Sequence, residues 1–218
     1  MRRGLLFAVL FVAATVPAVG QTFAFDDQKP GEFPKGLTCA VTGPGRPGLW
    51  TLTKDEKVGH SVVLEQSDRD ATRDRFPHCV ADGVSVKDLE LSVRFRPISG
   101  NVDQAAGLVW RYRDADNYYI VRANAREGNV VLYKVEKGNR TDLPLKGEGR
   151  TYGRKADVPS GVWSELRVVA TGSLFTVSIN GQKLYQVEDA TFPDAGKVGV
   201  WTKADSVTRF DDFKVLAR

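Results

Sequence analysis

Apolar and polar residues alternate along much of the chain, and this alternation is its main structural signal. In the segment DLELSVRFRP (88–97), every second residue is apolar, while charged or polar residues fill the positions between. Successive side chains of a β-strand point to opposite faces, so this segment predicts an antiparallel strand with one buried face. Segment 174–179 alternates in the same way and runs through Asn180-Gly181, a strong hairpin signal, into a returning strand at 183–187.

The middle of the chain carries the same alternation in three neighbouring segments, 107–113, 118–124 and 130–135, separated by turn-forming residues. They predict three consecutive antiparallel strands joined by hairpins. Turn signals recur along the chain, and helical periodicity is almost absent. We therefore predict an all-β protein built as a sandwich of two antiparallel sheets.

Two regions depart from this regular pattern. The chain before the strand expected at 60–66 is rich in proline and glycine, which predicts an irregular path over the surface. Residues 66–87 are expected to form a long loop, with a short helical turn near DATRDRF (70–76). The related strings FAFDDQ (23–28) and RFDDFKV (209–215) predict neighbouring edge strands that bring the two chain ends together.

The first twenty residues have the composition of a cleaved export signal. Arg2 and Arg3 are followed by the short apolar run LLFAVLFVAATV (5–16) and then by small residues. This run is too short to span a bilayer, which needs about 20 apolar residues, and no other segment is apolar enough. We predict a signal peptide at 1–20 and a single β-sandwich domain at 21–218 in the periplasm or secreted, without stable membrane insertion. A retained N-terminal anchor is the alternative.

Charge and cysteine content narrow the possible partners. Removal of Arg2 and Arg3 lowers the formal net charge from +4 to +2, and the basic residues are interspersed with acidic ones. This pattern is typical of a solvated surface, so we predict no nucleic-acid partner. Cys39 and Cys79 are predicted to form a disulfide, because an exported protein folds in an oxidising compartment. Two separate buried thiols are the alternative, and the spacing matches no zinc site.

The mid-chain strands are rich in arginine, tyrosine and amide side chains. Alternation places Tyr118, Arg122 and Asn124 on one face. In one interpretation, the stems of these side chains cover apolar surface while their charged ends reach solvent. In the other, the side chains converge on a concave face, where planar donors hold sugar hydroxyls and an aromatic ring stacks on the sugar. The candidate ligand-binding residues are Arg111, Tyr118, Arg122, Asn124, Lys134, Trp201 and Lys203.

Paired aspartates near both chain ends offer a possible metal site. Asp26 with Asp27, and Asp211 with Asp212, carry the oxygen ligands that calcium prefers. Such aspartates more often end strands and accept turn hydrogen bonds. We therefore predict no required cofactor and no metal site, with calcium as the alternative.

A resemblance to a known family is carried by the strings AAGLVWRYRDADNYYIVRANAREGNVVLYK, GKVGVWTKADSVTRFDDFKV and FDDQKPGEFPKG. These resemble exported bacterial proteins of the concanavalin A-like lectin/glucanase fold, close to the 3-keto-disaccharide hydrolase domain. The resemblance covers almost the whole chain after the signal peptide. It implies a jelly roll of two curved antiparallel sheets and a carbohydrate-related function. Glucanases of the laminarinase type carry Glu, Asp and Glu at alternating positions of one strand, and that motif does not occur here. The glucanase mechanism is therefore not expected.

Three functions are compatible with these features. The first is a non-catalytic, lectin-like module that binds a carbohydrate or sugar-like ligand through the candidate residues. The second is a glycoside hydrolase or lyase acting on 3-keto-disaccharides, in which a basic group on the same face or Asp205 supplies acid–base chemistry; no catalytic residue is assigned. The third is an envelope scaffold that binds other proteins. The sequence predicts neither the particular sugar nor the oligomeric state.

Overall fold

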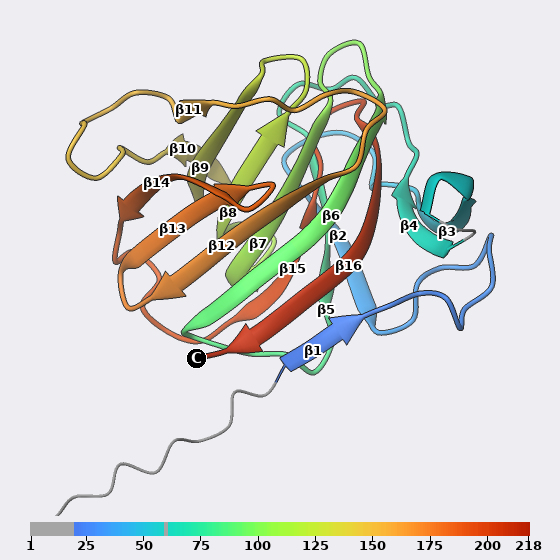
Figure 1. Cartoon of the computed structure of the whole chain (residues 1–218), viewed down its shortest axis with the longest axis horizontal. Helices are drawn as coiled ribbons and strands as arrows, with labels where there is room; N and C mark the ends of the chain where they lie inside the picture. Colours follow the sequence, from blue (N-terminus) through green and yellow to red (C-terminus); the bar gives the residue numbers. More distant parts are fainter. Residues whose placement is uncertain (1–19, 59–60) are drawn as a thin grey trace, which may run out of the picture.

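The computed structural model describes residues 20–58 and 61–218, which form two eight-stranded antiparallel sheets (Figure 1). Both sheets continue the alternation seen in the sequence, with one face of each turned to the other sheet. The first sheet has the order β14 (Gln182–Glu188), β13 (Leu174–Ile179), β12 (Ser164–Thr171), β6 (Leu89–Ser99), β16 (Val207–Ala217), β4 (Ser61–Gln66) and β3 (Trp50–Asp55), with β1 (Gly20–Phe23) paired to β16.

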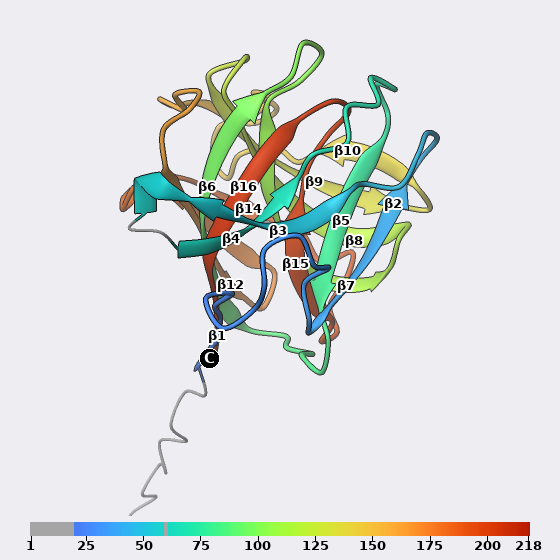
Figure 2. The same cartoon turned by 90° about the vertical axis from the view of Figure 1, so that its right-hand side faces the viewer.

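The second sheet contains the mid-chain hairpins. Its order is β10 (Asn139–Asp142), β9 (Asn129–Glu136), β8 (Asn117–Asn124), β7 (Ala105–Asp114), β15 (Lys197–Trp201), β5 (Phe76–Ala81) and β2 (Leu37–Thr42), with β11 (Arg154–Lys155) paired to β9. Figure 2 shows the two layers, with β6, β16 and β4 on the left and β5 and β2 on the right. The expected two-sheet antiparallel jelly-roll sandwich is confirmed, and the one short 3-10 helix among the described residues is Glu56–Val58.

Apolar side chains fill the space between the sheets. Trp110 of β7 and Tyr119 of β8 both pack on Phe175 of β13, with ring centroids 5.3 and 4.8 Å apart. All three are buried within one large cluster that draws on both sheets. Burial of apolar surface is the main stabilising contribution in such a layer, at about 25 cal/mol per Å². This core fixes the inner faces of β7 and β8, and with them the direction in which their outer side chains point.

The second sheet curls strongly, so its outer face is concave. The hydroxyl oxygens of Thr42 on β2 and Tyr118 on β8 lie 2.8 Å apart, although three strands separate β2 from β8 in the sheet. The turn before β10 is held against the turn before β8, where Gly138 N–H donates to the Asp116 carbonyl at 3.0 Å. A second cluster of buried residues, all from this sheet, fills the hollow. We call this surface the concave face.

Regions expected to be irregular contain three further strands. β2 and β3 lie in the N-terminal part that is rich in proline and glycine, and β5 lies within the loop expected at 66–87. Where a short helical turn is expected at 70–76, the structure has one hydrogen-bonded turn and no helix, with Arg75 N–H donating to the Thr72 carbonyl at 3.3 Å. The Arg75 side chain also ties this segment to two other loops by donating to the backbone carbonyls of Arg46 and Ala204, each at 2.6 Å. Proline and glycine occur in turns between strands as well as in irregular chain, and here they mark the turns.

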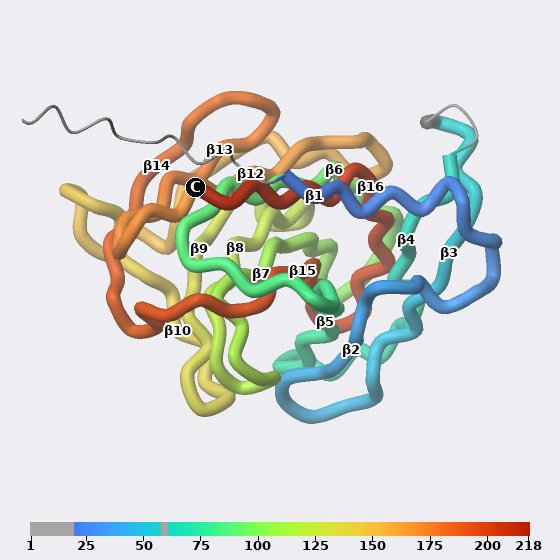
Figure 3. Tube along the Cα trace, turned by 90° about the horizontal axis from the view of Figure 1, so that it is seen from below, coloured from blue at the N-terminus to red at the C-terminus, as the bar shows by residue number. Residues whose placement is uncertain are grey.

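The two ends of the described chain pair directly. β1 runs antiparallel to β16, with Phe23 opposite Phe213 (Figure 3). The expected proximity of segments 23–28 and 209–215 is confirmed, but β16 lies inside the first sheet, between β6 and β4, and not at an edge. The predicted signal peptide lies outside the described residues except for Gly20. Among the helices that the structure describes, none has the length and apolar character needed to cross a membrane.

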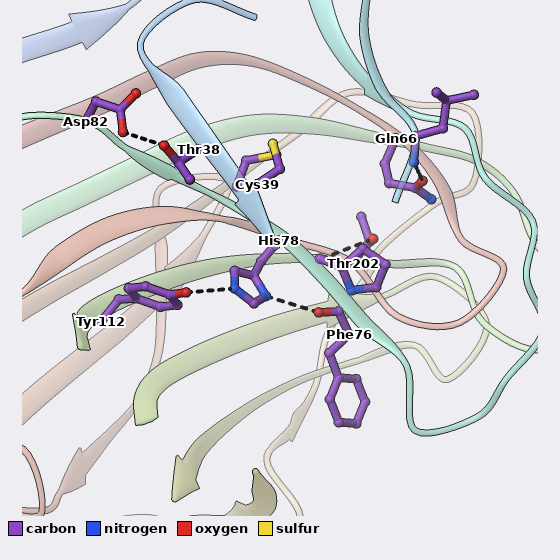
Figure 4. Close-up of a disulfide and its surroundings, with 11 residues drawn as sticks. Thr38, Cys39, Gln66, Phe76, His78, Asp82, Tyr112 and Thr202 are labelled. Atoms are coloured by element: carbon purple, nitrogen blue, oxygen red, sulfur yellow. Dashed lines mark hydrogen bonds between the residues drawn. A yellow bond between two sulfur atoms is a disulfide. The ribbon is translucent and has the colours of Figure 1, made fainter. Parts of the chain in front are cut away.

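The predicted disulfide between Cys39 and Cys79 is confirmed. It joins directly opposed residues of β2 and β5, whose Cα atoms lie 4.0 Å apart, and it closes a loop across 40 positions of sequence (Figure 4). β2 is the edge strand of the second sheet, so the bridge holds that edge against β5.

Replacing both cysteines with alanine (Cys39→Ala with Cys79→Ala) is expected to lower the free energy of unfolding by about 2–4 kcal/mol, because the bridge restricts the unfolded chain. Urea unfolding of the oxidised wild type and of the double variant measures the difference. Wild-type protein kept reduced with dithiothreitol should match the double variant. An unchanged unfolding midpoint would contradict the expectation.

Candidate functional site

Aromatic side chains form the floor of the concave face. The rings of Phe76 and Trp201 stack with centroids 5.4 Å apart, and Tyr118 packs on His78 at the same centroid distance. All four residues are buried. Gly107 of β7 makes room for this packing, because a Cβ there would lie 3.3 Å from the Trp201 ring. The floor is therefore a preformed apolar layer beneath the charged residues.

His78 is a neutral member of this floor. Its Nε2 lies 3.3 Å from the Tyr112 hydroxyl, and its Nδ1 lies 3.1 Å from the Phe76 carbonyl oxygen (Figure 4). Burial lowers the pKa of His78 to about 4, opposed only in part by the bond to that carbonyl. The imidazole is therefore uncharged near neutral pH, and the charge of the site comes from other residues.

Arg122 is buried on the concave face and carries a full ion pair. Its Nη1 and Nη2 donate to the two carboxylate oxygens of Glu127 at 3.0 and 2.7 Å, and Nη2 also donates to Asn129 Oδ1 at 3.0 Å. Such two-pronged, charge-assisted pairs are strong and directional. Burial acts to raise the pKa of Glu127, but the hydrogen bonds and charge of Arg122, with the Asn129 amide, outweigh it and lower that pKa. Glu127 is thus held as an oriented carboxylate.

A second ion pair adjoins the first through Asn124. The Asn124 amide donates to Asp103 Oδ1 at 2.5 Å and to Glu127 Oε1 at 3.1 Å. Lys203 Nζ lies 2.7 Å from the other oxygen of Asp103. Asn124 therefore links the Arg122–Glu127 pair to the Asp103–Lys203 pair. We call Asp103, Arg122, Asn124, Glu127, Asn129 and Lys203 the polar cluster.

Asp205 positions this cluster, because its carboxylate holds the backbone of the loop that carries Asp103. Its carboxylate accepts the backbone N–H groups of Asn101, Val102 and Asp103 at 2.6, 3.0 and 2.9 Å. Burial acts to raise the pKa of Asp205, but these backbone hydrogen bonds outweigh it and lower that pKa. A carboxylate so held is a poor proton donor, and the acid–base role considered for Asp205 stays a prediction.

The polar cluster reaches solvent at one margin. The side chain of Glu127 is 35% exposed and that of Lys203 is 16% exposed. Beside them lies Tyr152, which is 46% exposed and whose hydroxyl accepts a hydrogen bond from Tyr133 at 3.0 Å. The Tyr152 ring centroid lies 5.9 Å from Cζ of Arg122. We call Glu127, Lys203 and Tyr152 the rim. It offers a carboxylate, an ammonium group and an aromatic ring, each next to a buried residue of the polar cluster.

The structure gathers most of the residues predicted from the sequence. Tyr118, Arg122, Asn124, Trp201 and Lys203 all belong to the concave face or its margin. Tyr118 and Trp201 are fully buried and present no ring face to solvent. Their assignment as stacking surfaces stays a prediction, while the exposed aromatic ring beside the polar cluster is Tyr152.

Arg111 and Lys134 lie apart from the others. Arg111 adopts a positive φ of 48° in a β-bulge, which breaks the alternation of β7. Its guanidinium donates to the carbonyl oxygens of Phe192 at 2.9 Å and Gly172 at 2.5 Å. Lys134 is aligned with Tyr119 of the inter-sheet core, and its Nζ donates to Thr191 at 2.8 Å. The two cations hold loops at the other side of the sheet, and their ligand role stays a prediction.

Sequence reasoning missed Asp103, Glu127 and Tyr152. Glu127 lies in the turn between β8 and β9, and Asp103 and Tyr152 lie in loops of ordinary turn composition. The one available signal was the string NAREGN, in which Asn124, Glu127 and Asn129 surround a hairpin turn. Asp103 meets Asn124 only through the fold.

Three of the four aspartates considered for calcium, Asp26, Asp211 and Asp212, have protein partners. Asp26 accepts the backbone N–H of Val62 at 3.0 Å, and Asp212 lies 3.5 Å from Arg94. In the described ranges no three His, Cys, Asp or Glu side chains are grouped so as to hold a metal ion. The absence of a required metal stays a prediction, with calcium as its alternative.

The fold is that of carbohydrate-binding modules and β-sandwich lectins. Carbohydrate-binding module CBM66 from Bacillus subtilis superposes with a TM-score of 0.62 at 19% identity, covering 82% of this chain and 94% of that chain. Cellulose-induced protein Cip1 gives 0.61 at 12% identity, covering 90% and 96%. Domain 4 of AbnA, a GH43 extracellular arabinanase from Geobacillus stearothermophilus in complex with arabinotriose, gives 0.54 at 15% identity, covering 90% of each chain. At such identities the similarity establishes the fold alone.

The family follows from the sequence itself. The model of the 3-keto-alpha-glucoside-1,2-lyase-like domain matches residues 40–216. The chain belongs to this family, which confirms the resemblance to the 3-keto-disaccharide hydrolase domain. Among curated proteins, none matches the chain.

Replacing Arg122 with methionine (Arg122→Met) is expected to raise the pKa of Glu127, because the guanidinium is removed while the burial that opposes ionisation remains. Because the pKa of Glu127 is lowered in the wild type, its ionised form stabilises the fold at pH values above the unfolded-state pKa of about 4.3. This contribution to the free energy of unfolding is lost as the pH falls through the folded-state pKa. A carboxyl ¹³C NMR titration of both proteins measures the shift. Arg126→Met, which alters an exposed neighbour, serves as the control. Equal Glu127 pKa values in wild type and Arg122→Met would show that the pair does not control ionisation.

Proposed function

We propose that the protein is an exported carbohydrate-binding domain that holds a sugar at the rim of its concave face. Glu127 accepts hydrogen bonds from sugar hydroxyls, Lys203 donates to a hydroxyl or ring oxygen, and Tyr152 packs on the C–H face of the ring. Arg122, Asn124 and Asp103 keep these groups in place. The observation that carries the proposal is the oriented Glu127 carboxylate, bonded to Arg122 and Asn124 and still 35% exposed.

The chemistry of a sugar matches this arrangement. Each hydroxyl is both a donor and an acceptor, so the carboxylate and the ammonium group of the rim satisfy both requirements. An exposed ring supplies apolar contact with directional preference. Because Glu127 and Lys203 are already held by Arg122 and Asp103, binding costs little side-chain entropy.

The known proteins of this fold support the ligand class. One similar structure is described as a carbohydrate-binding module, and another was solved in complex with arabinotriose. Export is supported by the Cys39–Cys79 disulfide, since such bridges persist in oxidising compartments. The basic and apolar pattern of residues 1–20 is consistent with a signal peptide.

Tyr152→Ala is expected to weaken sugar binding about tenfold, or about 1.4 kcal/mol, because the variant loses the stacking ring. A glycan array identifies the ligand, and titration calorimetry of wild type and variant with that glycan gives the two dissociation constants. Phe33→Ala, which removes another exposed aromatic ring (53% exposed) away from the site, should bind as the wild type does.

Two results would count against the proposal. One is the absence of titratable binding to any glycan on the array, which favours the envelope scaffold that binds proteins. The other is an equal loss of affinity in Tyr152→Ala and Phe33→Ala, which places the contact elsewhere.

The family match favours a second candidate function, a lyase acting on 3-keto-α-glucosides. A ketone at C3 acidifies the neighbouring C2–H, so a base can take this proton while the C1–O bond breaks and a C1=C2 double bond forms. The leaving oxygen takes up a proton from solvent. At the rim, Glu127 is an ionised carboxylate that reaches solvent and is the candidate base for this step, and Lys203 is the candidate donor to the ketone oxygen.

If the lyase function holds, wild-type protein releases the aglycone from a 3-keto-α-glucoside, and Glu127→Gln lowers kcat by at least a hundredfold, within the range of general-base catalysis. Chromatography of the products measures the release. Binding of the same glucoside without release would assign the protein to the non-catalytic function. Unaltered kcat in Glu127→Gln would remove Glu127 as the base.

A further inference from the structure

Arg140, the second residue of β10, lies over the aromatic floor of the concave face. Its Cζ is 4.5 Å from the ring centroid of Tyr133, 4.6 Å from that of Phe76 and 5.8 Å from that of Trp201. Ring faces attract a cation, with a strength that grows as water is removed. The guanidinium is therefore held over the floor by these rings.

Arg140 differs from the buried arginines in having no carboxylate partner. Arg75, Arg96, Arg111 and Arg122 each have a carboxylate oxygen within 3.4 Å. For Arg140 the described part of the chain supplies no such ion pair, and its buried Nη1 has no hydrogen-bond partner. Arg140 is half-buried, and burying part of a charge without a counter-charge is costly. The aromatic rings offset that cost in part and satisfy none of the N–H groups.

A pocket opens beside this guanidinium. It has a volume of about 330 Å³ and is lined by Gly43 and Pro44 after β2, Asp74 and Phe76 at the start of β5, and Gly138, Asn139 and Arg140 at β10. β2 and β10 are the two edges of the second sheet, so the pocket lies where the curl brings these edges together. Its volume is near the lower end of ligand pockets, at about 300 Å³.

We propose that this pocket binds the carboxylate group of an acidic sugar, with Arg140 as its ion-pair partner. This inference rests on the proposed carbohydrate-binding function and adds a further subsite, whose lining includes none of the rim residues, together with the charge of the ligand. The planar guanidinium matches a carboxylate with two parallel hydrogen bonds, and in the described chain the buried Nη1 of Arg140 has no hydrogen-bond partner.

The other lining groups suit the rest of a sugar. Asp74 is exposed and has no ion pair with Arg140 among the described residues, so its carboxylate is available to accept from hydroxyls. The Asn139 side chain is exposed and can both donate and accept. Arg140 supplies one cation without a carboxylate partner in the described chain, and Asp74 and Asn139 supply acceptors for hydroxyl groups. This combination favours a singly charged sugar acid over a neutral sugar or a simple organic anion.

The test compares D-glucuronate with D-glucose, which differ in the carboxylate, at matched ionic strength. We expect calorimetry to give D-glucuronate a dissociation constant at least tenfold lower than that of D-glucose, and D-glucuronate to raise the melting temperature of the wild type. Arg140→Gln should lose this preference. Arg140→Lys, which keeps the charge without the planar fork, should retain part of it. The matched control is Arg150→Gln, which alters a 64% exposed arginine near the same strand.

Several outcomes overturn the inference. Equal affinity for the two sugars, no binding of D-glucuronate, or an undiminished preference in Arg140→Gln each exclude Arg140 as the carboxylate partner. A melting-temperature shift from sodium acetate as large as that from D-glucuronate would show an anion pocket without sugar recognition. If glucose and glucuronate bind equally and Tyr152→Ala weakens both, the proposed function stands and the acidic ligand alone is excluded.

Discussion

The curl of the second sheet is the constraint on which the candidate site depends. Neighbouring strands lie about 4.8 Å apart, so a flat sheet would keep Thr42 on β2 and Tyr118 on β8 far from one another. Their hydroxyl oxygens instead lie 2.8 Å apart. One such bond contributes only about 1 kcal/mol, so the aromatic packing inside the hollow maintains the curl, and the bond fixes its register. The same curl makes the outer face concave and brings both sheet edges to one pocket.

Burial on the concave face requires each charge to be compensated. Arg122 meets this requirement with Glu127, and Lys203 meets it with Asp103. Arg140 is only half-buried, and within the described chain ring faces take the place of a carboxylate partner. The first two arrangements give rigid groups whose geometry exists before any ligand arrives. The third leaves a cation whose hydrogen bonds are still to be made. The concave face thus combines the hydrogen-bonded polar cluster with Arg140, whose buried Nη1 has no partner in the described chain.

The fold was largely predictable from the sequence, and the site was predictable only in part. Alternation identified β6, β8 and β13 because each has one face in the core, and it placed Arg122 and Asn124 together correctly. It failed at Arg111, where a β-bulge with a positive φ turns the side chain to the other side of the sheet. It also failed for Asp103, which reaches Asn124 because Asp205, about a hundred positions along the chain, holds its loop. Contacts of that kind depend on the assembled sheets, and no local pattern encodes them.

The pairing of β1 with β16 has a consequence for how the chain reaches its final form. The first described strand pairs only with the last one, and β16 also lies between β6 and β4, so the first sheet cannot be completed until nearly the entire polypeptide has been synthesised. Tags joined directly to Gly20 or to the end of β16 would therefore lie at neighbouring points of the folded molecule.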